Sequence, residues 1–352
     1  MKLLLYSPAF LPRIGGLELN VAHLAEEIAR TGHEVVVVTT TPGTTDAAVP
    51  FRVVRRPGPF SLLCWVRWCE VFFQANVSLK GLWPLLLVRR PWVVSHHSWY
   101  CRTGGRMAWQ DRLKRRVVRH AAASIAVSQA MADDIGPPAI VIPNSYRDRL
   151  FRRVPGIDRH KELLFVGRLV SDKGVDILLE ALATLGTRGV RPALAIVGEG
   201  PERPALEEQA RRLGLDSQVT FHGLSRDEAL VRLMNEHQVL VVPSRYDEPF
   251  GIVALEGIAC GCVVVGSAGG GLAEAIGTCG RTFRNGSADE LAAVLGEVLA
   301  SDPAALERYR RDSAQHLRDH SSAAVTARYL EALLAAQRSR HKPGAATALR
   351  VS

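Results

Sequence analysis

The chain has few cysteines and no long hydrophobic run among its 352 residues. Its six cysteines include no Cys-x-x-Cys pair, which argues against a disulfide framework and a zinc site and favours a reducing compartment. No stretch approaches the roughly 18 consecutive apolar residues of a membrane span. The apolar run 3–6 is too short for a secretory signal. We therefore expect a cytoplasmic protein that is soluble or peripherally bound to a membrane.

Two motifs that would indicate other chemistries are also missing. Gly15-Gly16 is not part of a Gly-x-Gly-x-x-Gly fingerprint, and the apolar run 35–38 leads into Thr39 rather than an acidic residue. An oxidoreductase of the Rossmann type is therefore a weak interpretation. The sequence contains no Asp-x-Asp pair to hold a divalent cation, so we expect no metal ion in the chemistry.

Acidic residues are scarce in the first half of the chain. Residues 1–155 hold 21 Lys and Arg against 10 Asp and Glu, a net charge of +11, whereas residues 156–352 carry a net charge of −2. Between Lys80 and Arg119 the only acid is Asp111. Such a field suits an anionic partner, whether a membrane surface, a polyanionic acceptor or nucleic acid. A solvated basic face is the plain alternative.

Residues 61–92 are unusually apolar and aromatic, and Arg89-Arg90 lies near their end. Helices that belong to the core are the plain interpretation of this region. A basic amphipathic face resting on anionic lipid is the alternative.

Short apolar runs alternate with helical patterns in both halves. In the first half a strand at 3–6 is followed by a glycine loop, a helical pattern from Leu19 to Ile28 and a strand at 35–38. The second half repeats this order, with strands expected at 163–166, 193–197, 239–242 and 263–265. Strand, loop, helix and strand form a βαβ unit, so the sequence predicts two α/β domains with parallel sheets.

Val154-Pro155-Gly156 indicates a hinge between the two domains. We therefore expect an N-terminal domain over residues 1–155 and a C-terminal domain over 156–335. A helical pattern over 323–334 is expected to pack back on the N-terminal domain, and residues 336–352 are expected to form a flexible tail.

Each half has a glycine loop between a parallel strand and a helix, where backbone N–H groups favour anions. One loop holds Gly15 and Gly16, and the other spans residues 167–174. The second loop adds Arg168 and Lys173. The planar guanidinium of arginine can donate two parallel hydrogen bonds and the ammonium of lysine is a flexible point charge, so the pair suits a diphosphate. Charge on an ordinary surface loop is the alternative.

Two glutamates follow the strand expected at 239–242. Glu248 lies in the loop after this strand, and Glu256 lies in an apolar helix that begins near Gly251. A carboxylate in such a helix is unfavourable unless something pairs with it. Ribose hydroxyls would satisfy it, as they satisfy an acidic residue in dinucleotide sites. A salt bridge to a neighbouring helix is the structural alternative.

Glu248 and Glu256, with seven residues between them, resemble the E-x7-E motif of retaining glycosyltransferases of family 4, which have the GT-B fold. The resemblance covers roughly residues 1–335 and includes the segments 12–18, 32–35, 166–174, 197–201, 221–223, 243–244 and 269–274. It implies two Rossmann-like parallel-sheet domains facing across a cleft. In this family the N-terminal domain generally selects the acceptor and the C-terminal domain binds the nucleotide sugar.

The resemblance also implies roles for individual residues. Arg168 and Lys173 would hold the diphosphate, Glu256 would bind the ribose hydroxyls, and Glu248 would contact the transferred sugar. The other substrate-binding positions that it implies are two loop glycines and the backbone after Glu248, namely Gly15, Gly16, Phe250, Gly251 and Ile252.

A histidine near the reacting sugar would complete the catalytic set of Arg168, Lys173 and Glu248. His97 matches the family's histidine after an N-domain strand, and the adjacent His96 is the alternative. Asn144-Ser145 resembles a family segment in which Gly usually follows Asn, so Ser145 departs from the pattern. No catalytic role is expected for Asn144.

These patterns predict a retaining, metal-independent glycosyltransferase without a cofactor. It would move a sugar from a nucleotide sugar, UDP-linked by family frequency, to a hydroxyl of a glycan, glycolipid or metabolite. The expected partners are the nucleotide sugar, a glycan or lipid-linked acceptor and an anionic surface at the inner face of the cytoplasmic membrane, with no nucleic acid. Another GT-B enzyme, such as a nucleotide-sugar epimerase or a sugar phosphorylase, is the first alternative. A basic membrane- or nucleic-acid-binding protein is the second.

Overall fold

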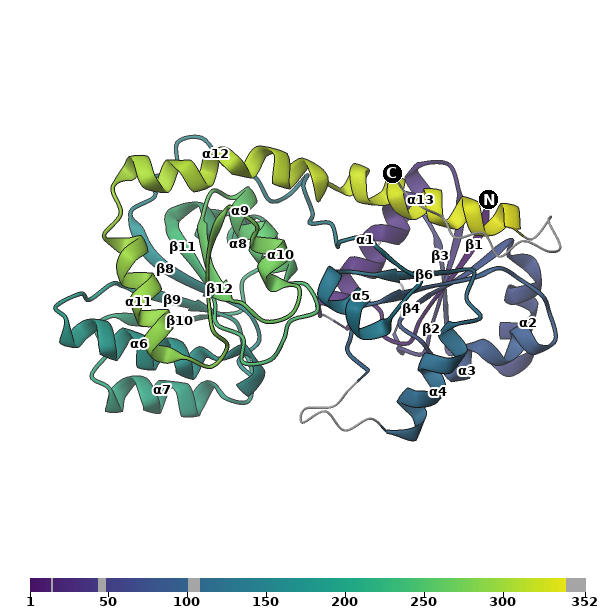
Figure 1. The fold of residues 1–352 in the computed structure, drawn as a ribbon, viewed down its shortest axis with the longest axis horizontal. Helices are drawn as coiled ribbons and strands as arrows, with labels where there is room; N and C mark the ends of the chain where they lie inside the picture. Colours follow the sequence, from purple (N-terminus) through teal and green to yellow (C-terminus); the bar gives the residue numbers. More distant parts are fainter. Residues whose placement is uncertain (14, 44–48, 101–107, 340–352) are drawn as a thin grey trace. The chain divides into compact units, whose positions relative to one another are not determined.

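The computed structural model describes residues 1–13, 15–43, 49–100 and 108–339. These residues form two compact units (Figure 1). Unit 1 comprises Met1–Ser145 together with the helix that begins at Ser322, and unit 2 comprises Tyr146–Ser321. Each unit contains one parallel β-sheet with helices packed on it. The two α/β domains predicted from the sequence are therefore confirmed.

Unit 1 has a seven-stranded sheet in the order β3-β2-β1-β4-β5-β6-β7. Its strands are β1 (Lys2–Ser7), β2 (Glu34–Thr39), β3 (Arg52–Arg55), β4 (Val71–Ala75), β5 (Trp92–His96), β6 (Ala123–Ala126) and β7 (Ala139–Val141). Its helices are α1 (Gly16–Arg30), α2 (Pro59–Trp68), α3 (Leu79–Leu82), the 3-10 helix η1 (Trp83–Leu86), α4 (Trp109–Val118), α5 (Gln129–Ile135) and α13 (Ser322–Ser339).

The strands of unit 1 are continuous apolar runs because both faces of the sheet are covered. Side chains on successive residues point to opposite faces of a strand. Leu3 and Leu5 accordingly pack in a core with residues of α1 and α13, whereas Leu4 and Tyr6 pack in a second core with residues of α2, η1 and α4. The sheet is thus held between two separate cores, and these hold the ends of the strands from which the loops at its carboxyl edge begin.

Residues 61–92 correct the sequence interpretation in part. The segment Val71–Ala75 is the central strand β4 rather than a helix or a surface face. Trp65 and Trp68 pack against the core, so the plain interpretation holds for most of this region. Leu86 and Leu87, by contrast, are exposed.

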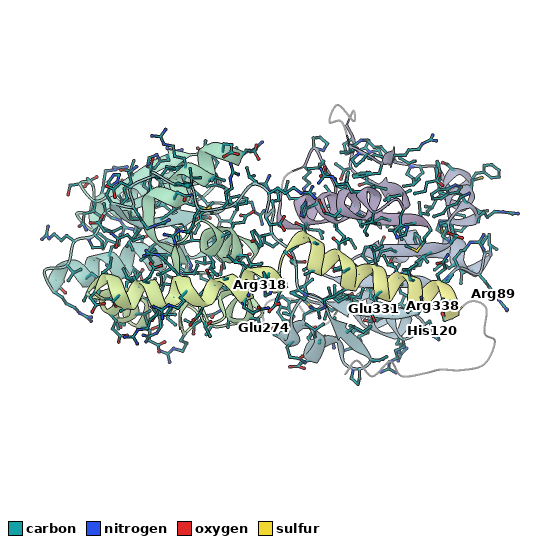
Figure 2. All side chains as sticks on the ribbon, turned by 90° about the horizontal axis from the view of Figure 1, so that it is seen from above. Arg89, His120, Glu274, Arg318, Glu331 and Arg338 are labelled. Atoms are coloured by element: carbon teal, nitrogen blue, oxygen red, sulfur yellow. The ribbon has the colours of Figure 1, made fainter. Side chains whose placement is uncertain are left out.

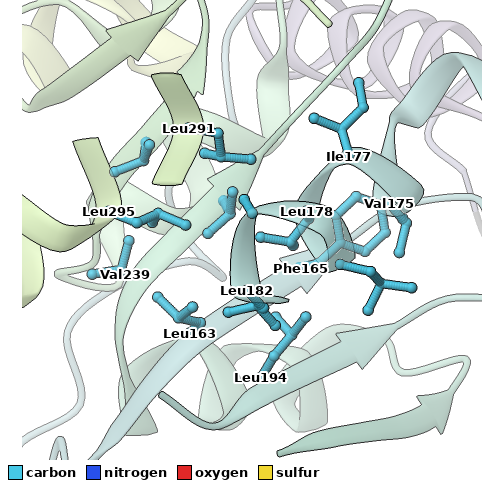
Figure 3. Close-up of a cluster of buried hydrophobic side chains, with 14 of the residues drawn as sticks. Leu163, Phe165, Val175, Ile177, Leu178, Leu182, Leu194, Val239, Leu291 and Leu295 are labelled. Atoms are coloured by element: carbon cyan, nitrogen blue, oxygen red, sulfur yellow. The ribbon is translucent and has the colours of Figure 1, made fainter. Parts of the chain in front are cut away.

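Unit 2 has a six-stranded parallel sheet in the order β10-β9-β8-β11-β12-β13. Its strands are β8 (Lys161–Val166), β9 (Leu194–Val197), β10 (Val219–Gly223), β11 (His237–Val242), β12 (Val263–Ser267) and β13 (Gly280–Phe283). Its helices are η2 (Ser171–Lys173), α6 (Val175–Thr187), α7 (Arg203–Arg212), α8 (Asp227–Glu236), α9 (Ile252–Ala259), α10 (Leu272–Ile276), α11 (Ala288–Leu299) and α12 (Pro303–Asp319). Figure 3 shows the core in which Leu178 and Leu182 of α6 and Leu291 and Leu295 of α11 pack against the strands.

The boundary between the units corrects the predicted domains 1–155 and 156–335. The chain passes to unit 2 at Tyr146, because the segment after it is hydrogen-bonded to unit 2. The side-chain amide of Asn235 accepts from Val154 N at 2.9 Å and donates to the Arg152 carbonyl at 3.0 Å. The hinge-like Val154-Pro155-Gly156 is therefore part of unit 2.

Helix α13 belongs to unit 1, so the second unit ends at Ser321 rather than at 335. The Tyr329 side chain is buried and its ring lies 5.9 Å from that of Phe73 in β4. The helix continues to Ser339, so residues 336–339 are helical, whereas 340–352 lie outside the described residues. None of the described helices is long and apolar enough to cross a membrane.

Candidate active site

The carboxyl ends of β8 and β11 form the centre of the candidate site in unit 2. These strands are hydrogen-bonded neighbours although β9 and β10 lie between them in the chain. The strand order therefore changes direction there, and the loops that follow the two strands leave toward opposite sides. Ligands of open α/β sheets bind at such switch points. The loops in question are 167–174 and 243–251.

The first loop positions Lys173 and Arg168. It ends in the 3-10 turn η2, after which Gly174 has φ +66° and begins α6. A side chain at Gly174 would collide with the carbonyl of Pro243, so the loop can approach β11 only with glycine here. Lys173 is about one quarter exposed. Arg168 is exposed and has no ion-pair partner in the described part of the chain.

Glu248 lies in the second loop, where its buried carboxylate accepts from three donors. Lys173 Nζ lies 2.5 Å from Oε1 and Ser244 Oγ lies 2.6 Å from the same oxygen. The Tyr246 hydroxyl donates to Oε2 at 2.9 Å. Burial opposes ionisation, but the Lys173 ammonium and the hydrogen bonds hold the pKa of Glu248 below its usual range. The carboxylate is therefore ionised at neutral pH.

Glu256 has the opposite environment. It lies in α9, its side chain has no hydrogen bond or ion pair within the described residues, and burial raises its pKa to about 7 despite the charge of Arg147. Arg147 itself pairs with Asp227 at 3.0 Å. The salt bridge to a neighbouring helix, which was the structural alternative, is therefore absent among the described residues. A carboxyl group without a partner in an apolar helix fits a ligand with hydroxyl donors.

The backbone between the two glutamates forms the open start of α9. Gly251 precedes the helix with φ +104°, a conformation that favours glycine, and no side chain caps the first turn. Phe250 is buried, with its ring 5.8 Å from that of His320. The first N–H groups of an uncapped helix are unsatisfied donors for a ligand. The family resemblance implies a substrate-binding role for this backbone at Phe250, Gly251 and Ile252.

Gly15 and Gly16 begin α1 at the carboxyl edge of the sheet in unit 1. Gly15 is extended, with φ −164°, and no side chain caps the helix. The carboxylate of Glu18 lies against Gly15 and 3.5 Å from Arg13 Nε. This helix start therefore already has an acidic neighbour, a feature that the sequence pattern of two glycines did not indicate.

The two adjacent histidines have different surroundings. His96 is fully buried and its ring nitrogens contact the Tyr100 hydroxyl and Ser124 Oγ, the latter at 3.0 Å. Burial lowers its pKa to about 3. His97, directly after β5, is partly exposed. Among the described residues, the one partner of its ring is Ser95 Oγ, 2.8 Å from Nε2. Burial also lowers the His97 pKa, to about 4. A neutral imidazole with a free Nδ1 makes His97 the better candidate to meet a substrate.

The structure thus brings Lys173 and Glu248 into contact. It places Arg168 on the same loop as Lys173, and Glu256 in helix α9, which follows the loop of Glu248. Gly15, Gly16 and His97 lie at the carboxyl edge of unit 1. Sequence reasoning missed Ser244 and Tyr246, although hydroxyl residues four and two positions before a buried glutamate are a usable signal. Asn144 accepts a buried hydrogen bond from Asn20 at 3.0 Å, which is a structural contact. Across the described ranges, no group of His, Cys, Asp and Glu is arranged to hold a metal ion.

Two family models match the chain, and the boundary between their matches lies where unit 1 passes into unit 2. The family described as "Glycosyl transferases group 1" matches residues 147–316, and "Glycosyltransferase Family 4" matches residues 14–145. The chain is 30% identical to a glycogen synthase of Mycobacterium tuberculosis, with 97% of each chain covered. It is also 30% identical to a D-inositol 3-phosphate glycosyltransferase of Mycolicibacterium smegmatis, with 94% of this chain and 89% of the other covered.

Solved structures show the same fold. HepE of Anabaena, crystallised with UDP and glucose, matches with a TM-score of 0.80 at 22% identity over 95% of this chain and 99% of the other. Sucrose-phosphate synthase of Thermosynechococcus elongatus matches with a TM-score of 0.77 at 23% identity, over 97% and 100% of the two chains. The fold, the matched families and the full-length relatives together show that this chain belongs to family 4 of the glycosyltransferases, enzymes of the GT-B fold.

Proposed function

We propose that this glycosyltransferase moves a sugar from a UDP-linked donor to a hydroxyl group of its acceptor, with retention of configuration and without a metal ion or cofactor. The observation that carries the proposal lies in unit 2, where the Lys173 ammonium contacts ionised Glu248 and the side chain of Glu256 has no partner among the described residues. Arg168 adds a second cation on the loop that carries Lys173. HepE, which has the same fold, was crystallised with UDP, and this supports UDP as the first nucleotide to test.

The chemistry fits these residues. Transfer breaks the bond between the anomeric carbon and a diphosphate oxygen, and a new bond forms between that carbon and the acceptor oxygen. The proton of the acceptor hydroxyl passes to the departing diphosphate, on which negative charge grows as the bond breaks. Fixed cations such as Arg168 and Lys173 bind that charge more tightly in the transition state than in the ground state. Because they can do so without a metal, and the sequence has no Asp-x-Asp pair, we favour metal-independent transfer.

Retention follows from where the acceptor attacks. No sequence motif marks an enzymic nucleophile on the sugar face opposite the diphosphate. We therefore favour attack from the face that the diphosphate leaves, as the family resemblance implies. Glu248 would hold hydroxyl groups of the sugar during this step, and His97 would lie near the reacting sugar.

Proton NMR of donor turnover tests the reaction. The protein is incubated with UDP-glucose and, separately, GDP-mannose, in the presence of EDTA and without acceptor. We expect UDP release with the sugar appearing first as the α-anomer, and Lys173→Ala should slow the release about 100-fold because a donor to the leaving charge is lost. If the sugar appears first as the β-anomer, retention is contradicted. If turnover occurs without EDTA but not with it, metal independence is contradicted. An epimerised nucleotide sugar would indicate an epimerase.

An anionic membrane is our proposal for the surroundings of the acceptor. Among the described residues, α2, η1 and α4 cover one face of the sheet of unit 1 and expose large apolar side chains: Phe60 (79% exposed), Leu86 (87%), Leu87 (68%) and Trp109 (70%). Exposed basic residues on the same elements and their connections are Arg67, Lys80, Arg89, Arg112, Arg116 and Arg119. Figure 2 shows Arg89 at the outer margin of this unit. Exposed apolar side chains and cations on the same elements match an anionic lipid surface rather than nucleic acid.

The proposal places the protein at the cytoplasmic side of that membrane. All five cysteines within the described residues are free thiols, which supports a reducing compartment. The named relatives concern glycogen and D-inositol 3-phosphate, two different acceptors. We propose a lipid-linked or glycan acceptor because of the apolar and basic face of unit 1.

A further inference from the structure

Lys173 has an ion-pair partner within the protein itself. Its ammonium lies 2.5 Å from Glu248 Oε1 and also 5.7 Å from the centre of the Tyr246 ring. The Glu248 side chain is only 8% exposed, so this ion pair is largely shielded from water. Screening by solvent, which weakens ion pairs at a surface, is therefore reduced here.

The hydrogen-bonding capacity of Glu248 is nearly used up. An ionised carboxylate has about four acceptor positions, two on each oxygen. Lys173 and Ser244 occupy both positions of Oε1, and Tyr246 occupies one position of Oε2. The residues that the structure describes leave one position on Oε2 open. A ligand that donates two hydrogen bonds to this carboxylate must therefore displace one of its present donors.

We propose that Lys173 exchanges partners, leaving Glu248 for the diphosphate when a donor binds, and that this exchange lets the site distinguish a nucleotide sugar from the free nucleoside diphosphate. The inference rests on the proposed function. A nucleotide sugar brings hydroxyl groups that take the place of Lys173 on Oε1. The free diphosphate brings none, so it leaves a buried carboxylate short of a donor, which is unfavourable.

The exchange has a consequence for turnover. After transfer the sugar has left, and Glu248 again competes with the diphosphate for Lys173. The carboxylate therefore weakens the binding of the product, whereas it strengthens the binding of the donor through the sugar. Arg168 has no ion-pair partner among the described residues. It would therefore bind the diphosphate both of the nucleotide sugar and of the free nucleoside diphosphate.

Titration calorimetry of UDP and GDP against wild type and Glu248→Gln tests this exchange. Glutamine keeps the size of the side chain but removes the charge that competes for Lys173. We expect the nucleoside diphosphate to bind Glu248→Gln about tenfold more tightly than wild type, the effect of one weakened charged pair. Lys173→Met should weaken binding more in the Glu248→Gln background than in the wild-type background.

Asp172→Asn is the matched control. Asp172 is exposed, adjacent to Lys173 in the chain, and its side chain has no ion pair within the described residues. Its substitution removes one negative charge near the same site and therefore measures the general effect of charge on anion binding. We expect it to change the affinity for the nucleoside diphosphate less than about threefold. Equal effects of the two substitutions, or weaker nucleotide binding by Glu248→Gln, would overturn the exchange. Failure of folded wild type to bind either nucleotide would instead contradict the proposed function.

Discussion

Glu256 shows how one side chain can report a ligand. Its carboxyl group lies in an apolar helix without a partner among the described residues, and burial raises its pKa to about 7. Its neighbour in the motif, Glu248, has three donors and a lowered pKa. Two glutamates eight positions apart therefore differ in their ionisation near neutral pH, because the carboxylate of one accepts three hydrogen bonds and that of the other has no partner among the described residues.

This difference predicts a pH dependence of nucleotide binding. In the proposed site, ribose hydroxyls would donate to the ionised form of Glu256, so binding should release a proton when the pH is below the raised pKa of about 7. Affinity for UDP should thus fall as the pH drops through 7 toward 6, by up to about tenfold for each pH unit. Glu256→Gln should lose this part of the dependence. Calorimetry of both proteins in buffers of different ionisation heat measures the proton, and equal slopes in the two proteins would contradict the assignment.

The site residues were partly predictable from sequence. Arg168, Lys173, Glu248 and Glu256 were found because charged residues stand out in glycine loops and apolar helices. Ser244 and Tyr246 were missed because uncharged hydroxyl residues do not stand out in a sequence. Their role depends on the fold, which brings their hydroxyl groups to the carboxylate of Glu248. The choice between His96 and His97 also needed the structure, since only burial and hydrogen bonds separate neighbouring positions.

At the scale of elements, the strands were the most predictable part. Parallel strands buried on both faces are continuous apolar runs, so 3–6, 35–38 and 239–242 could be assigned directly. The region 61–92 was ambiguous because α2 and β4 are both apolar and follow each other closely. The domain boundary was misplaced because a Pro-Gly pair indicates a turn but does not reveal which unit the turn packs on.

The outer face of α2, η1 and α4 gives a prediction for membrane binding. Leu86→Ser with Leu87→Ser should reduce retention on vesicles, because apolar burial contributes to peripheral binding. Arg112→Gln with Arg116→Gln should weaken binding to phosphatidylglycerol-containing vesicles about thirtyfold, since each cation near an anionic surface contributes about 1 kcal/mol. Sedimentation with phosphatidylcholine vesicles, with and without phosphatidylglycerol, measures both effects at low salt.

Unit 2 offers matched controls for this experiment. Leu213 is an exposed leucine of unit 2, and Arg188 and Arg191 are exposed cations there. Leu213→Ser and the double variant Arg188→Gln with Arg191→Gln should leave vesicle binding unchanged. If substitutions in both units weaken vesicle binding equally, then general charge and hydrophobicity explain the binding, and the face of α2, η1 and α4 has no special role. An absence of vesicle binding by the wild type would also contradict the membrane proposal.

At the scale of the whole molecule, the chain uses one architecture twice. Each unit has a parallel sheet whose strand order changes direction once, between β1 and β4 in unit 1 and between β8 and β11 in unit 2. The two family matches meet at the boundary between the units. The basic charge concentrates in the N-terminal half, whereas the candidate donor site lies in unit 2.

Calorimetric titration of the folded protein with UDP and GDP tests the central claim, that unit 2 binds a nucleoside diphosphate. We predict that one of the two nucleotides binds, and that Arg168→Ala and Lys173→Ala each weaken it about tenfold or more, because charge-assisted hydrogen bonds contribute about 1.5–3 kcal/mol each. Arg191→Ala, the loss of an exposed cation elsewhere in unit 2, should leave the affinity unchanged. Binding of neither nucleotide, or binding that is indifferent to Arg168 and Lys173, would contradict the account.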